Sequence, residues 1–298
     1  MTDEWLDGYD AVMQAAREAY RNSIKSTLAT DGLTGLGALS VAMREPEYDL
    51  PLNGKSEAAL YILSRVSGEG ADRTASEGDV FLTSTEIRDI AALAEKYRKF
   101  MLVLNVSGVV DLSPVVHKVG NILLLSQLGS ATGDAFADVL CGKSYPSGKL
   151  ASTWAKYEDY CRIGDFNPEE DTRYREGIYL GYRYFDSMKK EPLFPFGFGL
   201  GYTEFEIETL APTLKNATVL LPVVVKNTGK RAGKEVVEVY VSLPQGKLDQ
   251  PYQVLAAFEK TKELQSGQSQ RLEISFDMHS LASFESCGCQ RILEGGDY

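Results

Sequence analysis

The pattern of apolar and polar positions in the first half of the chain predicts helices that alternate with buried strands. Apolar side chains recur every three or four positions over residues 5–28, which is typical of an amphipathic helix. Residues 58–66 form an apolar run of strand length, and residues 101–106 and 121–126 form two more. Such runs are typical of strands that are buried on both faces.

Two further helices are expected between and after these strands. The first begins at Thr83 or Ser84, because a hydroxyl side chain can cap the free amides of a first turn, and it continues to residue 100. The second covers residues 132–140, whereas the glycines and prolines of residues 31–56 indicate an irregular connection. These elements predict an α/β fold with a mostly parallel sheet, in which ligands meet the loops at the carboxyl ends of the strands.

After Gly199 the pattern changes to short β-rich runs divided by turn sequences, which predicts a small antiparallel β-sandwich. The runs are residues 219–226, 235–243, 253–258 and 271–276. The connection at residues 193–203 is rich in aromatic side chains, so we expect it to be packed. The prediction is therefore an α/β-sandwich domain over residues 1–199 and a β-sandwich domain over residues 200–298.

Composition and charge narrow the possible partners. The 298 residues carry 31 basic and 42 acidic side chains and a net charge of −11, which opposes nucleic acid and anionic membranes as partners. No apolar stretch has the length of a membrane span, and the first residues do not resemble a signal sequence, so we expect a cytoplasmic protein. The four cysteines are expected to be free thiols, and we expect no metal and no cofactor.

The clearest candidate for chemistry is a carboxylate between two glycines. It lies in the loop at residues 65–73, after the first predicted strand, where the glycines expose Glu69 and allow another group to approach closely. A partly enclosed glutamate can hold its proton near neutral pH and donate it to a leaving group. The same residues are also compatible with a surface loop in which Arg73 pairs with Glu69 or Asp72.

The sequence lacks the motifs of nucleotide-binding proteins and of serine hydrolases. The Gly68-Glu69-Gly70 segment lacks the further glycine and helix start of a dinucleotide site, and no phosphate-binding loop with Lys-Ser or Lys-Thr occurs. No serine lies in a Gly-x-Ser-x-Gly turn, and the only histidines are His117 and His279. Nucleotide binding and serine-hydrolase chemistry are therefore disfavoured.

The loop Ser67-Gly68-Glu69-Gly70-Ala71-Asp72-Arg73 resembles the acid/base loop of family-three glycoside hydrolases of the β-glucosidase type. Further similar segments follow in the family's order: residues 78–83, 102–105, 135–150, 176–184, 192–203 and 226–237. The last two resemble the family's join between its α/β sandwich and its fibronectin-III-like domain, and the signature of that final domain. The resemblance covers roughly residues 60–295.

The resemblance implies a retaining hydrolase in which Glu69 is the general acid/base and an aspartate of a separate barrel domain is the nucleophile. It implies that Asp72 and Arg73 shape the loop. Glu77 is the next candidate for the acid/base, although its surroundings are typical of a turn. The implied substrate is a β-linked glucoside or oligosaccharide, and no cofactor is implied.

No segment resembles the family's barrel or its nucleophile motif. The implied partner is thus a barrel domain in a missing segment or in another chain, and both ends of the sequence lead us to expect a fragment, for example of a circularly permuted gene. Three hypotheses follow: an enzyme fragment that is inactive without a barrel, a non-catalytic carbohydrate-binding or interaction module, or an unrelated hydrolase.

Overall fold

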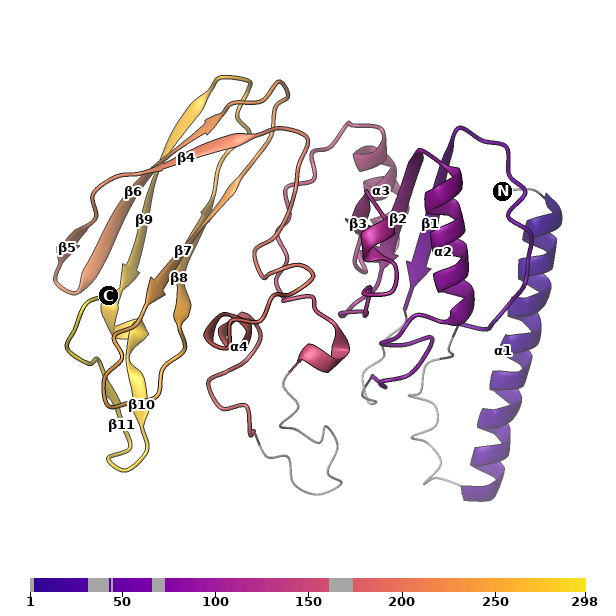
Figure 1. The fold of residues 1–298 in the computed structure, drawn as a ribbon, viewed down its shortest axis with the longest axis horizontal. Coiled ribbons are helices and arrows are strands. Elements are labelled where there is room, and N and C mark those ends of the chain that lie inside the picture. The colour runs from indigo at the N-terminus through magenta and orange to yellow at the C-terminus, as the bar shows by residue number, and fades with distance from the viewer. Residues whose placement is uncertain (1–2, 32–42, 44, 66–72, 161–173) are drawn as a thin grey trace. The chain divides into compact units, whose positions relative to one another are not determined.

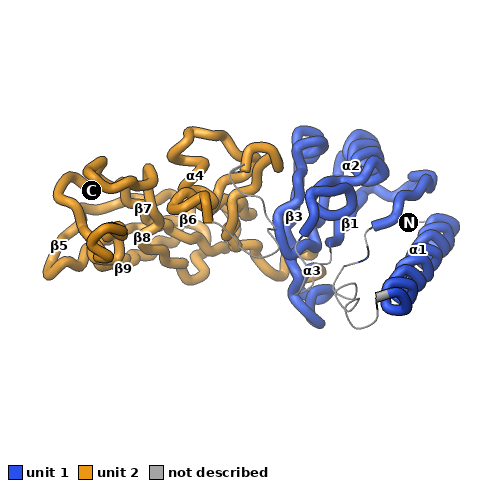
Figure 2. Tube along the Cα trace, turned by 90° about the horizontal axis from the view of Figure 1, so that it is seen from below, with its two compact units in different colours: residues 1–136 blue, residues 137–298 orange. Residues whose placement is uncertain are grey.

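A computed structural model describes residue 43 and residues 3–31, 45–65, 73–160 and 174–298. The chain divides into two compact units, residues 1–136 and residues 137–298, which are coloured separately in Figure 2. Helix α3 (Thr132–Leu140) contains the boundary between them.

The first unit contains a parallel three-stranded sheet in the order β1-β2-β3 (Figure 1). The strands are β1 (Ala58–Ser64), β2 (Lys99–Asn105) and β3 (Ile122–Leu124), and the helices are α1 (Asp3–Asp31), α2 (Ser84–Lys96), η2 (Val116–Lys118) and η3 (Gly129–Ala131). The prediction of a parallel α/β sheet is therefore confirmed. Strand β2 lies in the middle, and its Leu102, Val103 and Leu104 are all buried.

Helix α2 begins where the sequence predicts and ends earlier. Thr83 is the N-cap, because its hydroxyl accepts a hydrogen bond from the Glu86 amide at 3.1 Å while the Glu86 carboxylate accepts one from the Thr83 amide at 2.8 Å. The predicted end at residue 100 is wrong. The helix stops at Lys96, because the chain from Lys99 onward pairs with β1 in a parallel register.

Strand β1 is less buried than its apolar sequence predicts. Leu60 and Ile62 are 45% and 54% exposed, whereas Leu63, on the opposite face, is buried. Strand β1 is one of the two edge strands of the described sheet, and only the face that carries Leu63 packs into the core.

The second unit is built mainly from antiparallel strands, as predicted. One sheet contains β4 (Phe205–Thr209), β5 (Thr213–Lys215), β6 (Thr218–Asn227) and β9 (Ser269–Asp277), and two further pairs are β7 (Val236–Ser242) with β8 (Gln253–Lys260) and β10 (Ser283–Glu285) with β11 (Gln290–Ile292). Its helices are η4 (Tyr157–Asp159), α4 (Tyr182–Ser187) and η5 (Met278–Leu281). The core cluster includes Val223, Val225 and Leu272.

The aromatic connection before β4 is packed in part, as expected, whereas Leu200 and Tyr202 near its end are 78% and 43% exposed. Trp154 and Phe194 form an isolated antiparallel bridge, and the Phe194 and Phe198 rings lie 5.2 Å apart. The division of the chain at residues 199 and 200 stays a prediction. Within the described part of the chain, Cys141, Cys287 and Cys289 are free thiols, and the helices are all too short or too polar to cross a membrane.

Candidate functional site

The candidate loop begins at the carboxyl end of β1, and the structure describes the residues on both sides of it. Glu69 and Asp72 lie outside the described residues, and Arg73 lies within them. Arg65 directly follows β1, and its amide donates to the Asn105 carbonyl at 3.1 Å, which extends the pairing with β2 by one bond. The loop therefore starts from the edge of the sheet at which ligands of parallel folds bind.

Arg65 is held by a buried ion pair. Its Nη1 and Nη2 atoms donate to the two carboxylate oxygens of Glu86, both at 2.7 Å, and both side chains are almost fully buried. A bidentate pair of this kind fixes both the distance and the plane of the guanidinium. The Glu86 carboxylate also accepts a hydrogen bond from the Thr83 amide at the start of α2. One carboxylate therefore links the start of the helix to the start of the loop.

Arg73 is held by a second ion pair on the other side of the loop. Its Nε atom donates to the Asp79 carboxylate at 2.7 Å, and its Nη1 atom donates to the Val109 carbonyl at 2.6 Å. A Cβ atom on Gly108 would lie 2.8 Å from Nη1, so the absence of a side chain there allows the guanidinium to approach the backbone. Arg73 thus links the end of the loop to the segment after β2.

The two arginines bind the same backbone atom. The Asp79 carbonyl oxygen accepts a hydrogen bond from Arg65 Nε at 2.8 Å and another from Arg73 Nη2 at 3.0 Å. We refer to Arg65, Arg73, Asp79 and Glu86 as the loop anchor. The guanidinium groups of the two residues that flank the loop are therefore held at one common point.

The surroundings of Asp79 favour its charged form. Burial alone would raise the pKa of this carboxyl, but the hydrogen bond from the Thr74 amide and the hydrogen bond and charge of Arg73 together lower it. A carboxylate that stays ionised keeps Arg73 in place. Glu77, the alternative acid/base candidate, is exposed and forms an isolated bridge with Phe81, on either side of the turn at residues 78–80.

Polar side chains at or after the ends of β2 and β3 also lie at the sheet edge that is formed by the carboxyl ends of the strands. Gln127, which follows β3, donates through its side-chain amide to the Arg65 carbonyl at 3.0 Å. The Asn105 side chain lies at the end of β2, with its Nδ2 atom 3.5 Å from the Ser64 hydroxyl. The described residues contain no group of His, Cys, Asp and Glu side chains suited to a metal ion.

The loop anchor contains contacts that sequence reasoning missed. The described carboxylate partner of Arg73 is Asp79, whereas the sequence suggested Glu69 or Asp72. Arg65 and Glu86 were not singled out, because they are 21 residues apart and belong to different elements. One signal was available: the Thr83-x-x-Glu86 spacing is that of a capping box, which would have marked Glu86 as a buried carboxylate.

Comparisons with known proteins agree with this arrangement of an α/β region and a β-sandwich. Residues 8–202 match the family described as "Glycosyl hydrolase family 3 C-terminal domain", and residues 235–298 match "Fibronectin type III-like domain". These matches define the class as the C-terminal region of a glycoside hydrolase. The chain belongs to glycosyl hydrolase family 3.

Relatives and solved structures support this assignment. Beta-glucosidase A of Butyrivibrio fibrisolvens is 35% identical over 82% of this chain and 35% of its own length. A beta-glucosidase structure from Paenibacillus barengoltzii has a TM-score of 0.80 at 32% identity, over 98% of this chain and 34% of that one. Beta-glucosidase 3B of Thermotoga neapolitana, solved in complex with glucose, has a TM-score of 0.74 at 34% identity, over 94% of this chain and 42% of its own. The chain thus spans well under half the length of these relatives.

Proposed function

We propose that this chain supplies the general acid/base of a retaining β-glucosidase, with Glu69 in that role. The proposal is carried by the observation that Arg65 and Arg73, on either side of Glu69, bind the same carbonyl oxygen of Asp79. Membership of a glycoside hydrolase family supports it further. We also propose that the nucleophile, an aspartate, belongs to a barrel domain outside these 298 residues.

The proposed reaction has two steps. In the first, the barrel aspartate attacks the anomeric carbon of a β-linked glucoside, the bond to the leaving oxygen breaks, and the Glu69 carboxyl transfers its proton to that oxygen. In the second, the Glu69 carboxylate removes a proton from water, and the water oxygen attacks the anomeric carbon and releases the aspartate. Both steps use one carboxyl group, so its position is critical.

That position depends on two conditions. The first is that the residues that flank the loop are held in place, and the loop anchor supports this within the chain, since it binds Arg65 and Arg73 to one carbonyl. The second is that the loop reaches the nucleophile of the barrel, because the acid/base and the nucleophile of a retaining enzyme lie about 5 Å apart. The second condition requires the barrel, and we therefore expect no turnover from the chain alone.

The test joins this chain to the part of the Paenibacillus barengoltzii relative that it does not cover, where the proposal expects the barrel, and compares Glu69→Ala with Glu77→Ala. For a glucoside with a poor leaving group, kcat should fall about 100- to 10,000-fold in Glu69→Ala, because no group protonates the departing oxygen. A glucoside with a good leaving group should lose less in the first step. With this second substrate, azide should restore turnover of Glu69→Ala and yield glucosyl azide. Azide is already an anion, so it can attack the anomeric carbon in the second step without a base to remove a proton.

Glu77→Ala is the matched control, since it removes an exposed carboxylate that lies close to the loop in the sequence. It should change kcat less than twofold. Size-exclusion chromatography first establishes that each joined protein is folded and monodisperse. A folded wild-type fusion without activity would contradict the role of this chain, and azide rescue of Glu77→Ala in place of Glu69→Ala would contradict the choice of residue.

A further inference from the structure

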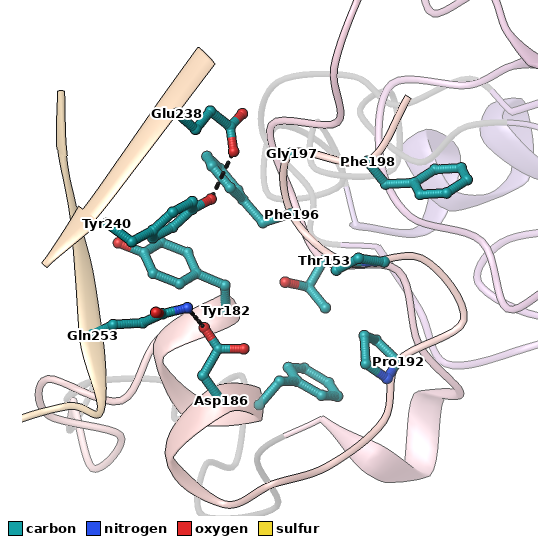
Figure 3. A pocket seen from close by; sticks show the side chains of 12 residues that line it. Thr153, Tyr182, Asp186, Pro192, Phe196, Gly197, Phe198, Glu238, Tyr240 and Gln253 are labelled. Carbon is teal, nitrogen blue, oxygen red and sulfur yellow. Dashed lines mark hydrogen bonds between the residues drawn. The ribbon is translucent and has the colours of Figure 1, made fainter. Parts of the chain in front are cut away.

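The second unit contains a cavity of about 290 Å³ that plays no part in the proposed reaction (Figure 3). It lies between α4, the aromatic segment at residues 192–198, and the paired strands β7 and β8. Its volume is just below the about 300–1,000 Å³ that is usual for small-molecule sites. The cavity therefore has room for a ligand of modest size.

Aromatic rings form the apolar part of the lining. The Tyr182 ring lies 5.0 Å from the Phe196 ring and 5.6 Å from the Tyr240 ring, measured between centroids. The Tyr182 hydroxyl accepts a hydrogen bond from the Leu255 amide at 2.7 Å, which fixes the ring against β8. Rings held in this way offer preformed flat faces, and the negative face of an aromatic ring attracts C–H groups.

Two carboxylates are oriented by neighbouring donors. Tyr240 donates its hydroxyl to Glu238 at 2.7 Å, and Gln253 donates its side-chain amide to Asp186 at 2.9 Å; both bonds are drawn in Figure 3. Each bond uses one carboxylate oxygen. Among the described residues, the second oxygen of each carboxylate has no hydrogen-bond partner, so both carboxylates can still accept from a ligand.

Thr153 adds a polar group without a partner. The residue is 4% exposed, and within the described part of the chain its hydroxyl makes no hydrogen bond. In Figure 3 this hydroxyl points into the cavity, toward the side on which Tyr182 and Asp186 lie. Because a buried hydroxyl without a partner is costly, a ligand that bonds to it would gain affinity.

We propose that this cavity binds a small neutral ligand rich in hydroxyl groups, of the size of one sugar ring. The free carboxylate oxygens of Asp186 and Glu238 can accept hydrogen bonds, and the Thr153 hydroxyl can donate one. A ligand hydroxyl group can both donate and accept, so it can pair with all three side chains. An organic cation would satisfy the carboxylates and the rings, but it would leave the Thr153 proton unpaired. This inference does not depend on Glu69 or on a barrel domain.

The experiment titrates the full chain with D-glucose and follows binding by ligand-observed NMR and calorimetry. Wild type should bind glucose, and Thr153→Val, which keeps the shape and removes the hydroxyl, should weaken binding about three- to tenfold. Thr213→Val on the exposed strand β5 is the matched control and should bind as wild type does. Glu69→Ala should also bind normally, which separates this site from the proposed acid/base.

Asp186→Asn provides a second variant in case Thr153→Val does not fold, as judged by the absence of a cooperative thermal transition. It keeps the side-chain shape and removes the charge, so glucose binding should again weaken severalfold. Propylammonium serves as the cationic probe. The proposal is overturned if wild type does not bind glucose, if neither variant weakens binding, or if propylammonium binds in a Thr153-dependent manner while glucose does not.

Discussion

The two arginines of the loop anchor make similar bonds in different surroundings. The Arg65 and Glu86 side chains are 4% and 2% exposed, whereas those of Arg73 and Asp79 are 24% and 21% exposed. The attraction within a buried ion pair offsets the free energy of its desolvation only in part. Removal of one partner nevertheless lowers the free energy of unfolding by about 3–5 kcal/mol, because the other charge is left buried and unpaired. Arg65 therefore acts mainly by fixing geometry, while Arg73 depends on the ionisation of its partner.

That dependence predicts how acid affects the first unit. Because the pKa of Asp79 is lowered in the folded state, its contribution to the free energy of unfolding is complete above the ordinary value of 3.8 and is lost as pH falls through the folded value. Asp79→Asn should thus be less stable than wild type at pH 7, with a difference that shrinks below about pH 4. Urea unfolding at pH 7, 5, 4 and 3 measures this difference.

Glu77→Gln is the control for this series, because it removes an exposed carboxylate that has no described ion-pair partner. Its stability should follow that of wild type at every pH. A difference between wild type and Asp79→Asn that stays constant from pH 7 to pH 3 would contradict the role of the Asp79 charge.

At the scale of elements, the sequence offered two candidates, Thr83 and Ser84, for the N-cap of helix α2. The structure assigns the cap to Thr83, whose side chain is buried and bonded to the Glu86 amide. Ser84, the first residue of the helix, instead donates its hydroxyl to Glu47 at 3.2 Å on the surface. The two hydroxyl residues are adjacent, yet only one satisfies a backbone donor of the first turn.

Alanine substitutions should separate these two residues. Thr83→Ala is expected to lower the free energy of unfolding by about 1 kcal/mol, and by up to about 2 kcal/mol, because the Glu86 amide loses its acceptor. Ser84→Ala should change it by less than about 0.5 kcal/mol, because it removes only a surface bond. Urea unfolding measures both, and equal losses in the two variants would contradict the assignment of the cap.

Elements with strong local patterns were predictable, and the weaker ones were not. Residues 132–140 and the four longer strands of the second unit follow a clear apolar period, and the structure contains all of them. Strands β4 and β5 were missed because they are only five and three residues long and most of their side chains are exposed, although β4 does alternate apolar and polar residues. Likewise, Arg65 binds a backbone carbonyl, and sequence patterns do not specify such bonds.

At the scale of the whole molecule, each compact unit has a core of its own. Leu104 lies in the central strand of the first unit and is 2% exposed, and Leu272 lies in β9 of the second unit and is 1% exposed. The second core was predictable from the alternation of its strands. The first was predictable in part, because the sequence could not tell which strand lies at the edge and which in the middle.

Two matched substitutions test whether these cores are independent. Leu104→Ala and Leu272→Ala remove the same atoms from equally buried sites, so each should cost about 2–5 kcal/mol in the unit that contains it. Calorimetry should therefore resolve two transitions, with Leu104→Ala lowering one and Leu272→Ala the other. If a single transition were lowered by both, the cores would unfold as one. Separate transitions would allow loop-anchor variants to be studied while the second unit, with its cavity, stays folded.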